Sequence, residues 1–358
     1  MIYFDNAATT LPKPEAVKEA VWNAMETLGN SDRGAHDASL GSMRAIYSAR
    51  EQAAQIFGAE SPSQIAFAKN ATEALNVAIK GLLGPGDHVI TTAAEHNSVL
   101  RPLYELEKRG TALSILPCDG RGVVELERLD ELLLPNTRAV VCTHASNVTG
   151  NVVDAARVGR FCREHGLLFI LDTSQTAGAL DTRMEVLGAD VICFTGHKGL
   201  YGPQGTGGLC VRKGVEIAPL ICGGSGIQSY RREHPPQMPT RLEAGTQNVH
   251  GLAGLAAGIQ FVLDTGLDRI REREEMLVRR FCQGIQDIPG IRLYGDLTGE
   301  PHMGVAAFNI GDYDSGQVSD ELAVRFGIAS RPGAHCAPLM HEALGTREQG
   351  AVRFSFSW

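Results

Sequence analysis

The stretch Asp190-Val191-Ile192-Cys193-Phe194-Thr195-Gly196-His197-Lys198 joins a continuous apolar run to a short polar segment that ends in a lysine. Such a run predicts a strand buried on both faces, as in a parallel sheet covered by helices. Leu167–Leu171 and Ala139–Cys142 are similar runs, and helical segments such as Ala155–His165 lie between them. This alternation of strands and helices predicts an α/β domain with a mostly parallel sheet.

The sequence pattern at the two ends of the chain differs from that of this central part. Pro12 and Pro14 open a segment with apolar residues at helical spacing. From about residue 262 a charged helix is expected over 267–288, with its charge run 271–275 facing solvent. Weaker strand patterns follow at 291–294 and 304–310. We therefore predict a large α/β domain of residues 14–261 and a small α+β domain of residues 1–13 and 262–358.

Composition excludes several classes of protein. The 358 residues are 43% hydrophobic and 21% charged, as in folded globular proteins. A net charge of −8 gives no basic footprint for nucleic acid or an anionic membrane. The eight cysteines form no C-x-x-C pair, which favours free thiols in a reducing compartment and no metal site. Without a signal-peptide pattern or an apolar run that suits a membrane span, we expect a cytoplasmic protein.

Polar residues gather where the predicted strands end, which is where open α/β sheets bind ligands. Each cluster alone is compatible with a helix cap, a core histidine or a surface lysine. Together they would bring a cation, acids and bases to one edge of the sheet. The four clusters are Ala94-Glu95-His96-Asn97, Thr143-His144-Ala145-Ser146-Asn147, Asp172-Thr173-Ser174-Gln175 and Thr195-Gly196-His197-Lys198.

Two of the motifs point to specific chemistry. Lys198 follows a buried strand in a Gly-rich segment, where a lowered pKa would make its amine a nucleophile; a surface turn is the alternative. Asn70-Ala71-Thr72-Glu73 begins a helix, which indicates an anion site or a simple cap. No Walker motif and no G-x-G-x-x-G follow a strand, so nucleotide binding by the usual routes is unsupported.

The C-terminal part carries a cysteine and an arginine of interest. Cys336 lies beside His335 and near Arg331 in a Gly/Pro-rich loop, where cationic neighbours favour the thiolate, although a structural cysteine fits too. Arg353 lies in an alternating strand, from which it either holds a carboxylate with two hydrogen bonds or faces solvent.

In combination these motifs resemble the class V, fold-type I pyridoxal-phosphate (PLP) enzymes, and within them the cysteine desulfurases and selenocysteine lyases. The resemblance follows the family's order from Tyr3-Phe4-Asp5-Asn6-Ala7-Ala8 through Glu243-Ala244-Gly245-Thr246 to Arg353. It implies a large domain with a mainly parallel seven-stranded sheet between helices, plus a smaller α+β domain that carries the cysteine loop.

The resemblance also implies roles for individual residues. Lys198 would hold PLP as a Schiff base and move the substrate proton, and Asp172 would pair with the pyridinium nitrogen. His96 would stack on the ring and help with proton transfer. Asn147 and Gln175 would contact the cofactor's phenolic oxygen or the substrate. The phosphate would be bound by Thr72, Thr195 and His197, and by Thr246 from the other subunit of a homodimer. Ala71 would also contact the cofactor. Substrate contacts would come from Arg353, on the substrate carboxylate, and from Asn147, Ala8, His36 and Arg331.

The reaction that the resemblance implies is a cysteine desulfurase reaction. Cys336 would take the sulfur of L-cysteine as a persulfide, L-alanine would leave, and the sulfur would pass to an acceptor protein, as in iron–sulfur cluster assembly. The short loop around Cys336 resembles the group II (Suf-type) pattern. The chain ends at Trp358, soon after Arg353, whereas the family continues into a terminal helix, so we expect either a truncated sequence or an abbreviated small domain.

Three alternatives stay open from the sequence. A selenocysteine lyase could dispense with Cys336. A class V aminotransferase or amino-acid lyase would keep the fold without sulfur transfer. A non-catalytic sulfur-relay or scaffold protein would use Cys336 alone, but the presence of Lys198 and Asp172 in their motifs argues against it.

Overall fold

The structure is a computed structural model that describes residues 1–31, 34–299 and 301–358. The strands are β1 (Ile2–Tyr3), β2 (Ile65–Ala68), β3 (His88–Thr92), β4 (Ala112–Leu116), β5 (Thr137–Thr143), β6 (Leu168–Asp172), β7 (Val191–Thr195), β8 (Gly207–Val211), β9 (Ile291–Tyr294), β10 (Val305–Ile310), β11 (Ile328–Ala329) and β12 (Val352–Ser355). The α-helices are α1 (Glu15–Thr27), α2 (Asp37–Phe57), α3 (Ala71–Leu82), α4 (Asn97–Glu107), α5 (Ala155–Glu164), α6 (Met184–Leu187), α7 (Val249–Thr265), α8 (Leu267–Ile285), α9 (Ser315–Phe326) and α10 (Pro338–Ala343). Short 3-10 helices span Pro62–Gln64, Leu126–Leu132 and Thr240–Leu242.

The large sheet confirms the predicted α/β architecture. In the described part of the chain it has seven strands in the order β2-β8-β7-β6-β5-β3-β4. Neighbouring strands from β7 to β4 are parallel, and β8 runs antiparallel to both of its neighbours. The carboxyl ends of β3, β5, β6 and β7 therefore meet at one edge of the sheet.

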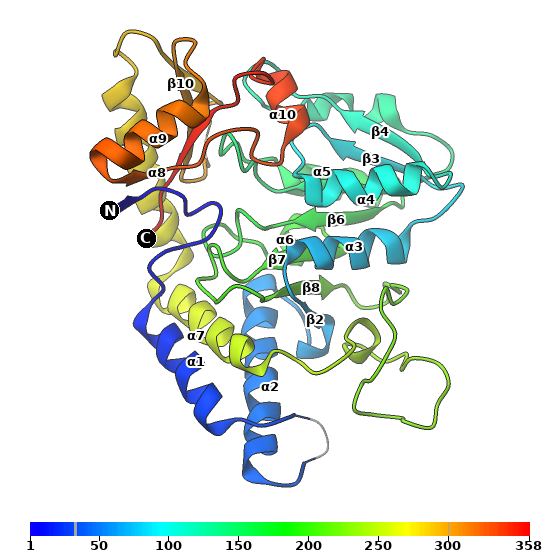
Figure 1. Cartoon of the computed structure of the whole chain (residues 1–358). Helices are drawn as coiled ribbons and strands as arrows, with labels where there is room; N and C mark the ends of the chain where they lie inside the picture. The colour runs from blue at the N-terminus through cyan, green and yellow to red at the C-terminus, as the bar shows by residue number, and fades with distance from the viewer. Residues whose placement is uncertain (32–33, 300) are drawn as a thin grey trace.

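Helices cover both faces of this sheet because its strands are apolar on both sides. Val141, Ile170 and Val191 pack under α3 and α4, while Val140 and Phe169 face the layer of α2, α5 and α7. Figure 1 shows these two helical layers on either side of the strands. The alternation follows from the two-residue repeat of a strand, which sends successive side chains to opposite faces.

A smaller α+β unit carries both ends of the chain. The antiparallel order β12-β10-β9 packs against α8 and α9. β1 pairs in parallel with β11, which places the two termini close together (Figure 1). The division after residue 261 stays a prediction. α7 continues through that position to Thr265, and Gly266 adopts a φ of 89° between α7 and α8.

The charged helix α8 differs from expectation in two ways. It ends at Ile285 rather than at 288, before the Pro289-Gly290 pair that cannot continue a helix. The expectation that its charge run faces solvent is wrong for Glu274, which is buried. Glu274 lies four residues from both Ile270 and Val278, so helical periodicity puts it on the buried face. Burial raises the pKa of this carboxyl to about 8.

We predict that Phe194→Ala destabilises the fold strongly. Phe194 is fully buried in β7, and its ring centroid lies 4.6 Å from that of Phe57 in α2. Removing such a ring should lower the free energy of unfolding by about 3–5 kcal/mol, measured by urea denaturation. Tyr230→Ala, at an exposed position, is the control and should change it by less than about 0.5 kcal/mol. A loss below about 1 kcal/mol for Phe194→Ala would contradict this account of the core.

Candidate active site

A cavity of about 340 Å³ lies at the edge of the large sheet where the parallel strands end. Its walls come from the ends of β5, β6 and β7, the beginnings of α3 and α4, the N-terminal segment and the loop of Cys336. Nearly all of the residues predicted for the site line it. They are Ala8, Ala71, Thr72, His96, Asn147, Asp172, Gln175, Thr195, His197, Lys198, Arg331, Cys336 and Arg353.

Two predicted residues lie elsewhere. Among the described residues that line this cavity, neither His36 nor Thr246 is found. His36 caps α2, where its Nδ1 accepts a hydrogen bond from the Ser39 N–H at 3.4 Å. Thr246 lines a separate cavity together with Phe67 and Leu252. Within one chain, therefore, the structure gives His36 a capping contact and puts Thr246 outside the cavity.

Lys198 and Asp172 bring an amine and a carboxylate to the cavity. The pKa of the Lys198 amine is lowered to about 8, mainly because the amine is desolvated; Asp172 opposes this shift and Arg353 adds to it. Asp172 is the last residue of β6. Its Oδ1 accepts hydrogen bonds from the Ser174 N–H at 2.9 Å and the Ser174 hydroxyl at 2.5 Å, which orient the carboxylate. Ser174 is a functional neighbour that the sequence motif contained but that we did not single out.

His96 presents a neutral imidazole to the same cavity. Its Nδ1 accepts a hydrogen bond from the Ser98 N–H at 3.0 Å, so the ring proton is on Nε2. Burial lowers the pKa of His96 to about 4, and the Lys198 charge adds to the effect. The Ser98 hydroxyl lies 2.8 Å from the same Nδ1 and 2.7 Å from the Thr72 hydroxyl. Ser98, which the sequence analysis missed, thus connects the beginnings of α3 and α4.

The residues present fit a phosphate group at one end of the cavity. The Thr195 hydroxyl oxygen and His197 Nδ1 are buried and have no hydrogen-bond partner among the described residues. Buried polar atoms nearly always have a partner. Both residues line the cavity together with Ala71 and Thr72 at the beginning of α3, where free N–H groups favour an anion. A phosphate ester bound by these groups, together with Lys198 and Asp172 in the same cavity, matches the donor set that PLP requires.

Arg353 is buried and tied to the chain's other end. It is 2% exposed, and burial lowers its pKa to about 10 despite the carboxylate of Asp5. Its Nη1 donates to the Asn147 carbonyl at 2.9 Å and its Nη2 to Asp5 Oδ1 at 3.1 Å. Asp5 also accepts from Arg331 Nε at 2.9 Å and Nη2 at 2.6 Å. Asp5 is therefore the shared counter-ion of two arginines. In the sequence, its place in the Tyr3–Ala8 motif was the only signal for this role.

Cys336 sits on a backbone turn that other segments hold in place. Cys336 is exposed, and His335 and Cys336 both have left-handed φ angles, 49° and 56°. Such angles are unfavourable for residues other than glycine. The Cys336 carbonyl accepts from the Asn97 N–H at 2.7 Å, and the His335 carbonyl accepts from Asn147 Nδ2 at 2.8 Å. The thiol is thus exposed at the cavity on a turn anchored to α4 and to the β5 loop.

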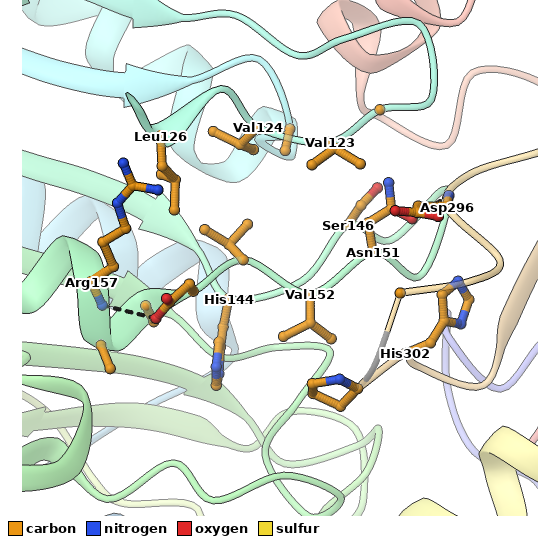
Figure 2. A pocket seen from close by; sticks show the side chains of 18 of the residues that line it. Val123, Val124, Leu126, His144, Ser146, Asn151, Val152, Arg157, Asp296 and His302 are labelled. Carbon is orange, nitrogen blue, oxygen red and sulfur yellow. Dashed lines mark hydrogen bonds between the residues drawn. The ribbon is translucent and has the colours of Figure 1, made fainter. Parts of the chain in front are cut away.

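A second cavity has a volume of about 590 Å³. Figure 2 shows Val123, Val124, Leu126 and Val152 along its walls together with His144 and His302. It shares a wall with the candidate site, because Ser146 lines the second cavity and Asn147, the next residue, lines the first.

The described residues carry no other obvious centre. They contain no group of three or more His, Cys, Asp or Glu side chains placed to hold a metal ion. Among the described helices, none combines the length and apolar character needed to cross a bilayer.

Comparisons with known proteins agree with this geometry. The family profile described as aminotransferase class-V matches residues 2–358, so the chain belongs to the class-V aminotransferase family. This family implies PLP as the cofactor. Within it, the relatives described next are named cysteine desulfurases.

Three of these relatives are similar over nearly their whole length. A probable cysteine desulfurase of Methanothermobacter thermautotrophicus is 34% identical over 364 residues, covering 100% of this chain and 90% of that protein. A probable cysteine desulfurase of Pyrococcus abyssi is 35% identical over 374 residues, covering 99% and 89%. The apo structure of the cysteine desulfurase from Thermococcus onnurineus NA1 superposes with a TM-score of 0.91 at 32% identity, covering 99% and 90%.

We predict that the Lys198 amine in cofactor-free protein titrates near pH 8, the value to which desolvation lowers its pKa. Competitive labelling with acetic anhydride, read by mass spectrometry of the Lys198 peptide, should show reactivity rising to half its maximum near that pH. The same peptide in urea-unfolded protein should titrate near the ordinary lysine pKa of about 10.4. Asp172→Asn should lower the folded midpoint, because Asp172 raises the pKa of Lys198. A folded midpoint equal to the unfolded one would contradict the prediction.

Proposed function

We propose that this protein is a PLP-dependent cysteine desulfurase that transfers the sulfur of L-cysteine to Cys336 and releases L-alanine. The observation that carries the proposal is that Lys198, Asp172 and Cys336 line one cavity. A lysine and an aspartate suited to hold PLP are common to many enzymes of this kind, whereas an exposed cysteine at the same cavity indicates sulfur chemistry. The names of the relatives support the same reaction.

The residues of the cavity divide between the parts of the cofactor. Lys198 would hold PLP covalently, and Asp172 would pair with its ring nitrogen. Thr72, Thr195 and His197 would bind the phosphate, and His96 would face the ring. When bound, PLP supplies an electron sink for bonds broken at the substrate's Cα.

Substrate binding and proton movement follow from the charges present. The buried guanidinium of Arg353, oriented by Asp5 and by the Asn147 carbonyl, would bind the substrate carboxylate. Gln175, whose Nε2 donates to the Ala7 carbonyl at 3.3 Å, borders the same space. With a pKa near 8, the Lys198 amine can both take up and release a proton at neutral pH, as transfer at the substrate's Cα requires.

The sulfur step balances without an outside oxidant. The Cys336 thiolate attacks the substrate sulfur, so an S–S bond forms, the substrate Cβ–S bond breaks, and Cβ gains a proton. L-cysteine and the Cys336 thiol thus become L-alanine and a Cys336 persulfide. Because Cys336 is exposed, we propose that an acceptor protein then takes the sulfur from it.

We predict that Cys336→Ser keeps the yellow colour of bound PLP but loses sulfur transfer. Alanine formation from L-cysteine should fall by at least about 10²-fold, because a serine hydroxyl is a weak nucleophile at neutral pH. The wild type should release alanine and reductant-labile sulfide in equal amounts. Cys222→Ser, which alters another exposed cysteine, is the matched control and should behave as wild type.

The same assay distinguishes the alternatives. Full turnover of L-cysteine by Cys336→Ser would overturn the role of Cys336. A preference for L-selenocysteine that survives Cys336→Ser would identify a selenocysteine lyase. A keto-acid product without sulfide would identify an aminotransferase, and a colourless protein that binds no PLP would leave only a scaffold role.

We further propose that the enzyme is a homodimer in which Thr246 completes the partner's phosphate site. Thr246 lies outside its own chain's cavity, and its neighbours Gly245 and Gln247 border a pocket with Met43 and Tyr47 of α2. Met43 and Tyr47 are exposed apolar residues, as is Trp22 of α1. Exposed apolar residues such as Met43 and Tyr47 beside one pocket favour a surface that another protein covers.

Sedimentation velocity tests the dimer. We expect a species of twice the chain mass, and a shift toward the monomer in Trp22→Glu, because a buried unpaired charge opposes association. A wild-type monomer at micromolar concentration would contradict the proposal. Val324→Glu, an exposed change on α9, is the control and should leave the dimer intact.

A further inference from the structure

Beneath the Cys336 turn lies a chain of buried polar groups that the proposed reaction does not use. His335 Nε2 is 3.0 Å from the Arg331 carbonyl, and His335 Nδ1 is 3.2 Å from His341 Nε2. His341 Nδ1 is in turn 2.7 Å from the Thr346 hydroxyl. The planes of the two rings are nearly parallel, 17° apart, and their centroids lie 5.4 Å apart. His335, His341 and Thr346 are all buried.

In this series of hydrogen bonds, the Arg331 carbonyl at one end determines which atom donates in each bond. A carbonyl only accepts, so His335 Nε2 carries a proton and donates to Arg331. In a neutral ring Nδ1 then accepts, so His341 Nε2 must donate to it. That leaves His341 Nδ1 as an acceptor for the Thr346 hydroxyl. Desolvation lowers the pKa of His335 to about 3, and Arg353 adds to the effect, which keeps this ring neutral. Desolvation also lowers the pKa of His341.

We propose that His341 and Thr346 are positioning residues, which act through His335 to hold the Arg331–Cys336 turn in the conformation that presents the Cys336 thiol to the cavity. The thiol's role in this statement rests on the proposed desulfurase function. The turn needs such support because His335 and Cys336 both keep left-handed φ angles. The hydrogen bonds from Asn97 and Asn147 hold the carbonyls of these two residues, whereas the histidine chain holds the His335 side chain and the Arg331 carbonyl.

The same series of hydrogen bonds also connects the Cys336 turn to β12, which carries Arg353. The Thr346 carbonyl accepts from the Gly350 N–H at 2.8 Å, just before β12 with Arg353. Arg331 and Arg353 exchange backbone hydrogen bonds at 3.2 and 2.8 Å. Thr346, His341 and His335 therefore close a ring of contacts that includes the groups proposed to bind substrate and sulfur. Without the Thr346 hydroxyl, His341 Nδ1 becomes a buried acceptor without a donor, so the imidazole that donates to His335 is held less firmly.

The test compares Thr346→Val, which removes the hydroxyl at constant shape, with Thr346→Ser, which keeps it. In PLP-loaded protein, Thr346→Val should speed amide hydrogen exchange in peptides covering residues 331–337 by about tenfold, because their local opening becomes easier. The kcat for alanine formation should fall about tenfold through misplacement of the thiol, while the KM for L-cysteine stays within about twofold. Thr346→Ser should match the wild type in all three measurements, and His341→Leu should reproduce Thr346→Val.

A buried threonine elsewhere supplies the matched control. The Thr111 hydroxyl donates to the Gly84 carbonyl at 2.8 Å, so Thr111→Val removes a comparable hydrogen bond away from the site. It should change neither exchange at residues 331–337 nor kcat, even where it lowers overall stability.

Each outcome decides the proposal. Unchanged exchange in Thr346→Val, or faster exchange with unchanged kcat, overturns it, as does a Thr346→Ser variant that behaves like Thr346→Val. If the wild type forms no persulfide at Cys336, the desulfurase function fails; the exchange comparison of valine with serine then still decides whether the histidine chain holds the turn.

Discussion

The geometry of the site depends most on the ion pairs that the Asp5 carboxylate forms with two arginines. Asp5 lies near the beginning of the chain and is shared by Arg331 and Arg353, which lie near its end. A buried guanidinium without a counter-charge would be strongly unfavourable. Asp5 therefore allows Arg353 to be held almost without exposure, and at the same time it ties the N-terminal segment to the strand and the turn that form one wall of the cavity.

Burial then sets the chemistry of the groups around this ion pair. Desolvation lowers the pKa of Lys198 to about 8 and that of His96 to about 4. The amine is thus able to exchange protons near neutral pH, while the imidazole stays uncharged. Cys336 differs from the strand cysteines Cys142 and Cys193, because burial raises the pKa of those thiols whereas Cys336 is exposed at the cavity. The thiol at the site is therefore exposed, whereas the thiols of these two strands are buried in the core.

Much of this site could be read from local sequence. The apolar run 191–195 ends at Thr195-Gly196-His197-Lys198, and the run 168–171 ends at Asp172; the parallel arrangement of β6 and β7 then necessarily brings Lys198 and Asp172 together. The family resemblance added roles to positions that periodicity alone leaves ambiguous. Contacts between distant segments could not be read in this way. Asp5 with Arg331, and His335 with His341 and Thr346, are joined by hydrogen bonds whose partners no local pattern specifies.

Two further outcomes show the same limit. Glu274 lies in a run of charged residues that suggests a solvated face, yet helix packing buries it. Thr246 and His36 belong to motifs of the site, but within one chain they lie outside the cavity. By itself, then, the sequence determined the α/β class, because the class follows from the two-residue repeat of strands and the 3.6-residue repeat of helices. The motifs also determined which polar groups follow the strands and which chemical types the site contains. Only the tertiary structure decided which charges share a counter-ion, which side chains are desolvated and how the Cys336 turn is held, because burial and long-range hydrogen bonds exist only once distant segments have packed together.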